Sequence, residues 1–591
     1  MSKEINSKIQ FWVVNSLEKA FPKSRKPKRS EQSITLFSAS NETEDAQILI
    51  RPKLGLNLNK VSFSFTDLSS TQSKIPKESL NGYWEWYTHV RKNARFSKLP
   101  WMHLKHAPAF FPDGFLEEKS IKIQQMWTHP LWVSVKVPKD TPKGKYKGSI
   151  QLHCEYTNPK EKVEGLYPKP ESTIISIPIT IIVWGFNLPG ENTLRHTEWF
   201  FPDLLARYFR VDLWSEKHWD LVQQAAEDMH EHLQDMILTS LFQLVDVIQK
   251  SKGEFEYNFS KLDRWITTFS TAGIKWFEIG HVGGRVGGWL SKIAFTRIKP
   301  IDENGKQLDT FEPHNMSEKE YIPILEDFIR ASYAFLSEKI DLNYCVQHIA
   351  DEPLKQNKES WSQIAKLMRS WIPKEVKTID AAFTKNMEGI DIRVPQIQHI
   401  HPSERNKTEG LEPNLWSYVC LAPQGNRPNR FLDYRSIRNR IIFWISYSLK
   451  LEGFLHWAYN WWSSWTFLPK SVDISPWMDS TAGSIYCHFR QPLPAGDPHI
   501  VYPGRTKICS SIRWEIIRKG FEDHKLLTLL EKIPKSSNSS SLLGERAEKL
   551  LSKVKNHVAK SSRKYTKNSN KLLHLRIQIG YLLDEFFENN N

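Results

Sequence analysis

The chain has 591 residues, a length that predicts more than one domain. Hydrophobic residues make up 40% of it and charged residues 25%, which is ordinary for a soluble globular protein. No run of about 18 apolar residues occurs, so the composition excludes an ordinary transmembrane helix. The formal net charge of +15 suggests nucleic-acid binding, but much of the excess lies near the two ends, where basic residues are more often solvated surface. We therefore expect no nucleic-acid partner and no membrane span.

The five cysteines are widely scattered and odd in number, which indicates reduced thiols rather than a disulfide framework. No Cys-x-x-Cys or His-Glu-x-x-His spacing occurs, so the sequence predicts neither a metal site nor a cofactor. The apolar run at residues 9–15 is too short and too interrupted for a secretory signal, and no small-residue cleavage site follows it. A cytoplasmic location is the expectation, with non-classical export as the alternative.

Residues 1–190 are predicted to form an antiparallel β-sandwich. Apolar and polar residues alternate at residues 61–65 and 131–137, as is typical of strands with one buried face. A longer segment at residues 172–184 is dense in isoleucine and valine. Short strands separated by turn signals favour a sandwich, and the Pro-Gly-Glu-Asn sequence at residues 189–192 is the expected boundary.

Residues 191–510 alternate between strand and helix patterns. The helical spacing is clearest at residues 215–232 and at residues 261–272, which end at Gly273. Eight strand–helix units over roughly 250 residues, with right-handed crossovers, predict a (β/α)8 barrel. The predicted strands are residues 195–200, 237–245, 274–279, 344–350, 377–383, 392–397, 415–420 and 453–460. Residues 511–591 are predicted to be a helical C-terminal region.

The fourth predicted strand ends abruptly in two adjacent carboxylates, Asp351 and Glu352, followed by Pro353. Two acids at the end of a buried strand are costly unless they are used or paired. Active sites of barrels lie at the C-terminal ends of the strands. We therefore interpret the two residues as a candidate acid/base pair; the alternative is a strand end whose acids face solvent. Glu198 and Glu278, near the ends of other predicted strands, are the main rivals for the acid.

Tryptophan is unusually frequent, with 23 residues. Its side chain combines a large apolar face with one polar group. A sugar ring has apolar C–H faces edged by hydroxyls, so exposed tryptophan suits a carbohydrate ligand. Many of these side chains are expected to fill the core instead.

Residues 348–353 (His-Ile-Ala-Asp-Glu-Pro) resemble the Asp-Glu-Pro strand end of the glycoside hydrolase family 123 catalytic domain. The turn at residues 142–148 is similar to one in the leading sandwich of that family. The resemblance covers about residues 120 to 530 and implies a sandwich, a barrel and a β-N-acetylgalactosaminidase-type activity on an oligosaccharide or glycoconjugate. Further similar segments follow in order at residues 415–418, 440–444, 453–457, 460–462, 496–497, 502–504, 511–515 and 518–523.

The resemblance also implies roles for the two acids. Glu352 would be the general acid/base, and Asp351 would hold and stabilise the 2-acetamido group of the substrate in a substrate-assisted, retaining reaction. Glu352 must then begin protonated and Asp351 ionised. A tyrosine commonly completes such a site by donating to the acetamido oxygen, and the candidates are Tyr418 and Tyr459 at predicted strand ends, with a core tyrosine as the alternative for each. The candidates for sugar-subsite walls are Trp416, Trp457, Trp461 and Trp462, and those for binding ring hydroxyls are Asn460 and Asp497.

Two other functions stay open. A barrel glycosidase of different sugar specificity would use a protein nucleophile, which requires another carboxylate about 5 Å from Glu352. A catalytically silent carbohydrate-binding protein could use the same cleft, although the two acids count against it. His348, earlier in the same strand, is expected to be a core histidine.

Overall fold

The computed structural model describes residues 8–94, 104–157, 170–251, 253–382, 387–401, 414–462, 475–480, 493–536 and 541–590. The chain divides into two compact units. The sandwich unit comprises Met1–Thr193, Gln424–Leu449 and Asn460–Asn591, and the barrel unit comprises Leu194–Pro423 and Lys450–Tyr459. These units are defined by compactness, so the three successive domains at residues 1–190, 191–510 and 511–591 stay a prediction. Within the described ranges, no helix is long and apolar enough to cross a membrane.

The N-terminal part of the sandwich unit contains two β-sheets. Neighbouring strands are antiparallel, except that β2 runs parallel to β12. One sheet has the order β1 (Ile9–Asn15), β3 (Glu42–Pro52), β10 (His129–Val137), β7 (Leu80–Val90) and β8 (Ala109–Phe115). The other has the order β2 (Ile34–Ser40), β12 (Glu171–Asn187), β11 (Gly144–Thr157), β4 (Asn57–Phe65) and β9 (Ser120–Ile123). In addition, β5 (Leu68–Ser69) pairs with β11, and β6 (Lys74–Ile75) pairs with β5.

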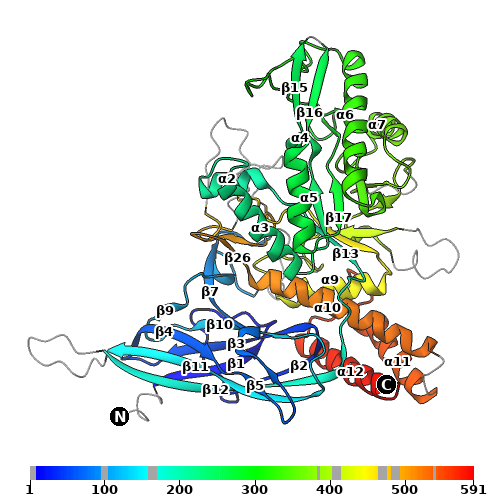
Figure 1. Ribbon diagram of the computed structural model, residues 1–591. Coiled ribbons are helices and arrows are strands. Elements are labelled where there is room, and N and C mark those ends of the chain that lie inside the picture. The colour runs from blue at the N-terminus through cyan, green and yellow to red at the C-terminus, as the bar shows by residue number, and fades with distance from the viewer. Residues whose placement is uncertain are drawn as a thin grey trace, which may run out of the picture. The chain divides into compact units, whose positions relative to one another are not determined.

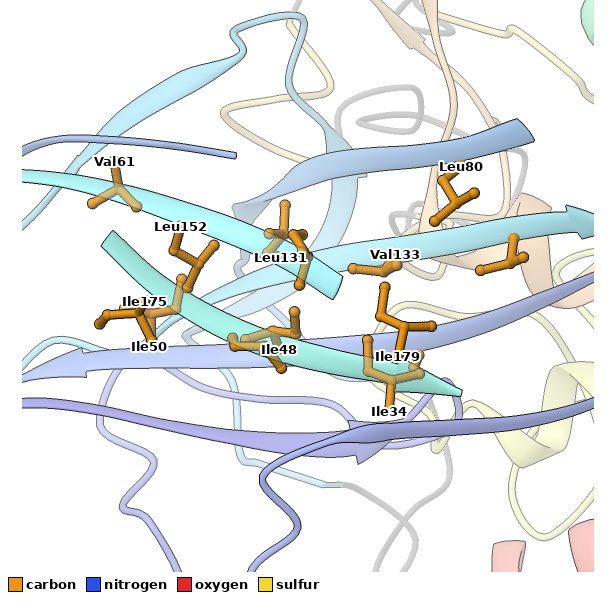
Figure 2. Close-up of a cluster of buried hydrophobic side chains, with 14 of the residues drawn as sticks. Ile34, Ile48, Ile50, Val61, Leu80, Leu131, Val133, Leu152, Ile175 and Ile179 are labelled. Carbon is orange, nitrogen blue, oxygen red and sulfur yellow. The ribbon is translucent and has the colours of Figure 1, made fainter. Parts of the chain in front are cut away.

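One apolar core joins the two sheets (Figure 2). Ile48 and Leu131 from the first sheet and Leu152 and Ile179 from the second belong to it, and all four are fully buried. Buried and more exposed residues alternate along β12, which is the period of two that a strand with one buried face requires. The predicted β-sandwich is therefore confirmed.

The predicted C-terminal helices are present in the sandwich unit. They are α10 (Ile512–Lys532), α11 (Ser541–Lys553) and α12 (Ser569–Glu588), and α9 (Ile437–Ser448) packs against α10. A short β-hairpin, β25 (Tyr502–Pro503) and β26 (Ile508–Cys509), precedes α10. The interior side of α10 carries buried charges: Asp523 accepts hydrogen bonds from Arg440 at 2.6 Å and from Arg576 at 2.9 Å. Buried charges of this kind are tolerated because each is paired.

In the described part of the barrel unit, one sheet contains eight parallel strands, one for each predicted strand. The order around the barrel is β22, β21, β20, β17, β14, β13, β24 and β23, and single backbone bridges between residues 393 and 415 and between 396 and 418 nearly close it. The predicted (β/α)8 barrel is confirmed. In chain order the strands are β13 (Arg195–Glu198), β14 (Met236–Thr239), β17 (Trp276–Ile279), β20 (Cys345–His348), β21 (Lys377–Asp380), β22 (Ile392–Arg393), β23 (Trp416–Tyr418) and β24 (Gly453–His456).

Several predicted strands end earlier than expected, among them β22 after Arg393 and β24 after His456, and one predicted strand is half wrong. The segment at residues 237–245 continues as a strand only to Thr239, and Leu241–Leu244 form the short helix α4. Both parts are apolar and largely buried, and the periodicity of so short a run does not separate a buried strand from a buried helical turn. The fifth predicted strand extends to Phe383, which lies outside the described residues.

Helices cover the barrel strands (Figure 1), and α3 lies against α5. They are α2 (Pro202–Phe209), α3 (Glu216–Glu231), α5 (Ser260–Ala272), α6 (Glu318–Lys339) and α7 (Lys358–Trp371), and α5 ends at Gly273 as predicted. A hairpin of β15 (Asp246–Ser251) and β16 (Glu254–Asn258) follows β14. A second hairpin, β18 (Gly283–Arg285) and β19 (Ile293–Phe295), lies in the glycine-rich segment after β17.

Candidate active site

The two acids lie immediately beyond β20, where the backbone turns. Ile349 and Ala350 are buried, whereas Asp351 and Glu352 are partly exposed. Glu352 has a φ of +46°, a left-handed conformation that a residue with a long side chain rarely adopts. Successive residues of a regular strand point to opposite faces, so a turn at this point allows both carboxylates to face the mouth of the barrel. Arg285 donates a hydrogen bond of 2.8 Å to the carbonyl oxygen of Glu352 and holds the turn.

Tyr418 contacts the second acid directly. It is the last residue of β23, its side chain is buried, and its hydroxyl donates a short hydrogen bond to Oε1 of Glu352. The structure therefore brings together Glu352 and one of the two tyrosines that the sequence suggested, from strands that are 66 residues apart in the chain. A donor at this position orients the carboxyl group of Glu352.

The surroundings of the two carboxyl groups separate their pKa values. Burial, aided by Asp380, raises the pKa of Asp351 to about 6, while Arg285 and His348 act in the opposite direction. Burial and the neighbouring charge of Asp351 raise the pKa of Glu352 to about 8, against the lowering effect of Tyr418 and Arg285. Between these values Asp351 is ionised and Glu352 is protonated, which is how one acid and one stabilising anion can coexist side by side.

His348, the last residue of β20 and three residues before Asp351, lies buried between two further carboxylates. Nε2 of His348 is 2.5 Å from Glu278 and Nδ1 is 3.0 Å from Asp380, and all three side chains are fully buried. Burial alone lowers the pKa of His348, but the two carboxylates outweigh it and raise the pKa to about 10. His348 is therefore an imidazolium ion at neutral pH. Asp380 also accepts a hydrogen bond of 3.1 Å from the backbone nitrogen of Ala350, next to Asp351.

Two family models match the chain, each over a different range of residues. The model described as "Glycoside hydrolase 123, catalytic domain" matches residues 199–530, more than half of the chain, and the model described as "Glycoside hydrolase 123 N-terminal domain" matches residues 14–154. The chain belongs to glycoside hydrolase family 123. It is accordingly a glycoside hydrolase, and the sequence-based recognition of the family is confirmed.

A solved family 123 structure shows the same fold. The family 123 glycoside hydrolase from Clostridium perfringens, studied for glycolipid glycan hydrolysis, matches with a TM-score of 0.69 and 16% identity over 98% of each chain. A GH10 xylanase from Thermobacillus composti matches with a TM-score of 0.29 and 11% identity, over 56% of this chain and 97% of its own. A β-glucuronidase from Bifidobacterium dentium gives 0.27 and 9%, over 81% and 62%. No significant match was found among curated proteins.

The two rival acids of this family 123 protein are both held in the barrel interior. Glu278 accepts hydrogen bonds from the hydroxyl of Thr197 at 2.5 Å and from the indole of Trp199 at 2.9 Å, in addition to its bond with His348. The carboxylate of Glu198 is fully buried and lies 3.7 Å from Nε2 of His196. These environments fix the two carboxylates as parts of the interior, so neither displaces Glu352 as the candidate acid.

His348 also lies next to a second histidine, His281. The rings of His281 and His348 are 4.4 Å apart between centroids, and burial, followed by the charge of His348, keeps the pKa of His281 well below its usual value. One donor atom each from His281, His348 and Asp380 lies within 4.8 Å of the others, a spacing that a metal ion could use. Both nitrogens of His348 are already hydrogen-bonded to carboxylates, so the geometry described is that of a hydrogen-bonded cluster. The predicted absence of a metal site stays a prediction.

Two of the predicted substrate residues of the barrel unit have core contacts. Trp416 is 3% exposed, and its ring covers Gly453 so closely that a Cβ atom there would lie 2.1 Å from it. The hydroxyl of Tyr459 donates a hydrogen bond of 2.6 Å to Asp228 on α3. These contacts correspond to the structural alternative for each residue and give no support to a role in substrate binding. Trp457, just beyond β24, is partly exposed and stays a candidate.

The other four predicted substrate residues belong to the sandwich unit. Asn460 forms a backbone bridge with His499. The backbone nitrogen of Trp461 donates to the carbonyl of Pro498 at 2.9 Å, and the indole of Trp462 donates to the carbonyl of Val501 at 3.0 Å. The carbonyl oxygen of Asp497 accepts from Arg430 at 3.2 Å. These residues therefore gather on two paired segments of the sandwich unit, and their roles toward substrate stay predictions.

Sequence reasoning missed three side chains that act on the acids: Arg285, Asp380 and, as a charged group, His348. Arg285 lies in the glycine-rich segment after β17, which contains none of the predicted site residues. Asp380 stands inside the predicted strand at residues 377–383, beside other polar residues, and nothing local marks it as functional. Its position at the carboxyl end of the strand next to β20 is the signal that could have found it.

Proposed function

We propose that this family 123 protein is a retaining β-N-acetylgalactosaminidase that removes terminal β-linked N-acetylgalactosamine from glycans by substrate assistance. The observation that carries the proposal is the asymmetry of two adjacent acids at the end of β20. Burial raises the pKa of both carboxyl groups, to about 6 for Asp351 and, with the charge of Asp351 added, to about 8 for Glu352. At neutral pH the pair thus offers one anion and one proton donor, and substrate assistance requires both.

The reaction proceeds in two steps. The carbonyl oxygen of the substrate's 2-acetamido group attacks the anomeric carbon while the bond from that carbon to the leaving oxygen breaks, and Glu352 gives its proton to that oxygen. The positive charge that forms on the oxazolinium ring is stabilised by ionised Asp351, which accepts the ring N–H. In the second step Glu352, now a carboxylate, removes a proton from water as the water attacks the anomeric carbon and reopens the ring. Two inversions give net retention.

The contacts of the neighbouring carboxylates favour substrate assistance over a protein nucleophile. Glu278 and Asp380 are both engaged with the imidazolium of His348 and with N–H or O–H donors of the barrel. A carboxylate in such a network is a poor nucleophile because its charge is already neutralised. The substrate's own amide supplies the nucleophile instead, so the protein needs only an acid/base and a stabilising anion.

We further propose that the natural substrate is the glycan of a glycoconjugate. The similar enzyme from Clostridium perfringens was studied for glycolipid glycan hydrolysis. The two chains share the fold over nearly their whole length, and the amide-assisted reaction requires only that the cleaved sugar carry a 2-acetamido group.

The test uses three chromogenic β-glycosides: of N-acetylgalactosamine, of N-acetylglucosamine and of galactose, which lacks the acetamide. The wild-type enzyme should cleave the first fastest and the last not at all, and the product should first appear as the β-anomer by NMR. Asp351→Asn and Glu352→Gln should each lower kcat by about 100-fold or more, since general acid/base and electrostatic effects are each of that order. Cleavage of the galactoside alone, or full activity in both variants, contradicts the proposal.

A further inference from the structure

The hairpin of β18 and β19 has an apolar tip, residues 286–290 in the loop between its strands. The sequence of the tip is Val-Gly-Gly-Trp-Leu, and all five residues are exposed. Val286 is 58% exposed, Trp289 36% and Leu290 60%. Turns are usually built from glycine and polar residues, and exposed apolar side chains normally occur singly. Three within five residues therefore mark a surface with a binding role.

The hairpin tip is tied to the turn that carries the acids. Arg285 donates to the carbonyl oxygen of Trp289 at 2.9 Å and to that of Glu352 at 2.8 Å, and its guanidinium lies 3.9 Å from the centre of the Trp289 ring. On the other strand of the hairpin, the backbone nitrogen of Ile293 donates to the hydroxyl of Ser360 at 3.0 Å. One side chain thus joins the tip to the candidate active site.

Hydrogen bonds within the loop hold the tip in shape. The backbone nitrogen of Val286 donates to the carbonyl of Lys292 at 3.2 Å, and that of Ser291 donates to the carbonyl of Gly288 at 2.9 Å. The hydroxyl of Ser291 accepts from the backbone nitrogen of Gly287 at 3.1 Å. Because part of its backbone is already hydrogen-bonded, the tip enters a less polar medium at a lower cost.

The charge around the tip has one sign. Residues 280–301 contain four basic residues and no aspartate or glutamate, and residues 353–358, which follow the acids, contain two lysines and again no acid. None of the lysines in these segments forms an ion pair with another described residue. The exposed lysines are Lys292, Lys299, Lys355 and Lys358. An apolar tip next to unpaired lysines matches a surface that is apolar inside and anionic outside.

The size and chemistry of the tip favour a lipid bilayer over a macromolecular partner. A specific protein interface takes about 20–30 residues a side, far more than this tip offers. Nucleic acid would use the lysines and leave the apolar side chains in water. A bilayer surrounds whatever enters it, so a few inserted side chains suffice, and tryptophan is favoured at the level of the lipid headgroups.

We propose that the hairpin tip and its neighbouring lysines dock the enzyme on an anionic lipid surface. Leu290, Trp289 and Val286 enter the headgroup region, and the lysines lie against the charged headgroups. The benefit of docking, though not the docking itself, rests on the proposed function. A glycan carried by a lipid is reached at the lipid surface, and the tip holds the acids at that surface.

The test measures flotation of the full-length enzyme with vesicles, in the absence of any substrate. The vesicles consist of phosphatidylcholine alone, or of phosphatidylcholine and phosphatidylserine at about 2:1. The wild type should float with the mixed vesicles, and more weakly with the neutral ones. The tip variant, Val286→Ser with Leu290→Ser, should partition onto the mixed vesicles about tenfold less, since two apolar side chains no longer leave water. Lys292→Gln should lower partitioning onto the mixed vesicles alone, by about fivefold.

A matched control removes two equally exposed aliphatic side chains elsewhere. Leu54 and Ile174, both in the sandwich unit, are 77% and 57% exposed, and Leu54→Ser with Ile174→Ser should float as the wild type does. An unchanged melting temperature shows that each variant is folded. A wild type that floats with neither kind of vesicle, a tip variant that floats like the wild type, or a control that loses as much, overturns the docking proposal.

Activity separates docking from the proposed function. With a glycolipid that ends in β-linked N-acetylgalactosamine, embedded in the mixed vesicles, kcat/KM of the tip variant should fall about tenfold, as its partitioning does. For a soluble aryl β-N-acetylgalactosaminide it should stay within about twofold of wild type, because neither Val286 nor Leu290 touches the acids. A wild type that floats with vesicles but cleaves neither substrate refutes the proposed function and leaves the docking surface standing.

Discussion

Replacing Tyr418 by phenylalanine removes the hydroxyl that donates to Glu352 and leaves the ring in the barrel core. That hydrogen bond stabilises the ionised form of Glu352 and so lowers its pKa, against burial and the charge of Asp351, which raise it. A hydrogen bond to a charged group contributes about 1.5–3 kcal/mol. Because one pKa unit corresponds to about 1.4 kcal/mol, the variant should raise the pKa of Glu352 by about one to two units.

The pH dependence of kcat/KM for an aryl β-N-acetylgalactosaminide measures this shift. The reaction needs ionised Asp351 and protonated Glu352, so the wild-type profile should rise through a pH of about 6 and fall through a pH of about 8. In Tyr418→Phe the descending limb should move to higher pH while the ascending limb stays in place. Tyr459→Phe is the matched control, because it removes a hydroxyl that donates to Asp228 instead. A descending limb that does not move in Tyr418→Phe, or that moves equally in the control, refutes the reasoning.

Three further substitutions test other parts of the structure. His348→Gln removes a positive charge that lowers the pKa of Asp351, so the ascending limb of the same profile should move to higher pH; a limb that stays at its wild-type position contradicts the charge assigned to His348. Asp523→Asn should lower the free energy of unfolding by about 3–5 kcal/mol in urea denaturation, as for one partner removed from a buried ion pair. Burial alone raises the pKa of Asp523, but two arginines lower it to about 2. The contribution of Asp523 to the free energy of unfolding is therefore complete above about 3.9, its pKa in the unfolded chain, and is lost as the pH falls toward 2. The difference in the free energy of unfolding between wild type and Asp523→Asn should shrink over that range. A difference that stays constant argues against the ion pair. Gly453→Ala should lower the melting temperature, by an overpacking cost of about 1–3 kcal/mol, because its Cβ would lie 2.1 Å from the ring of Trp416; an unchanged melting temperature would mean that the ring moves freely.

The fold was largely predictable because its signals are local. Each of the eight predicted barrel strands has a counterpart in the structure, and helices separate several of them along the chain. The β-sandwich follows from alternation along strands such as β12 and from turn signals between them. The segment at residues 237–245 was misjudged for the same reason, since one apolar run contains both the end of β14 and the helix α4.

The candidate site was only partly predictable, since its contacts join residues far apart in the chain. Asp351 and Glu352 could be found because both stand at one strand end. That Tyr418 rather than Tyr459 contacts Glu352 depends on the direction of each side chain, which no local pattern gives. The charge of His348 arises from Glu278 and Asp380, 70 and 32 residues away, so a histidine that looked like a core residue is an imidazolium ion.

In the proposed reaction the substrate's own acetamide is the nucleophile, and Asp351 and Glu352 assist it. The most direct measurement is kcat/KM for a series of aryl β-glycosides of galactosamine in which the N-acetyl group carries none, one, two or three fluorine atoms. Fluorine withdraws electrons from the amide oxygen and weakens it as a nucleophile, while the leaving group stays the same. We expect kcat/KM of the wild-type enzyme to fall steeply with each added fluorine. A rate that does not depend on the number of fluorines would contradict it, and would point to a nucleophile supplied by the protein.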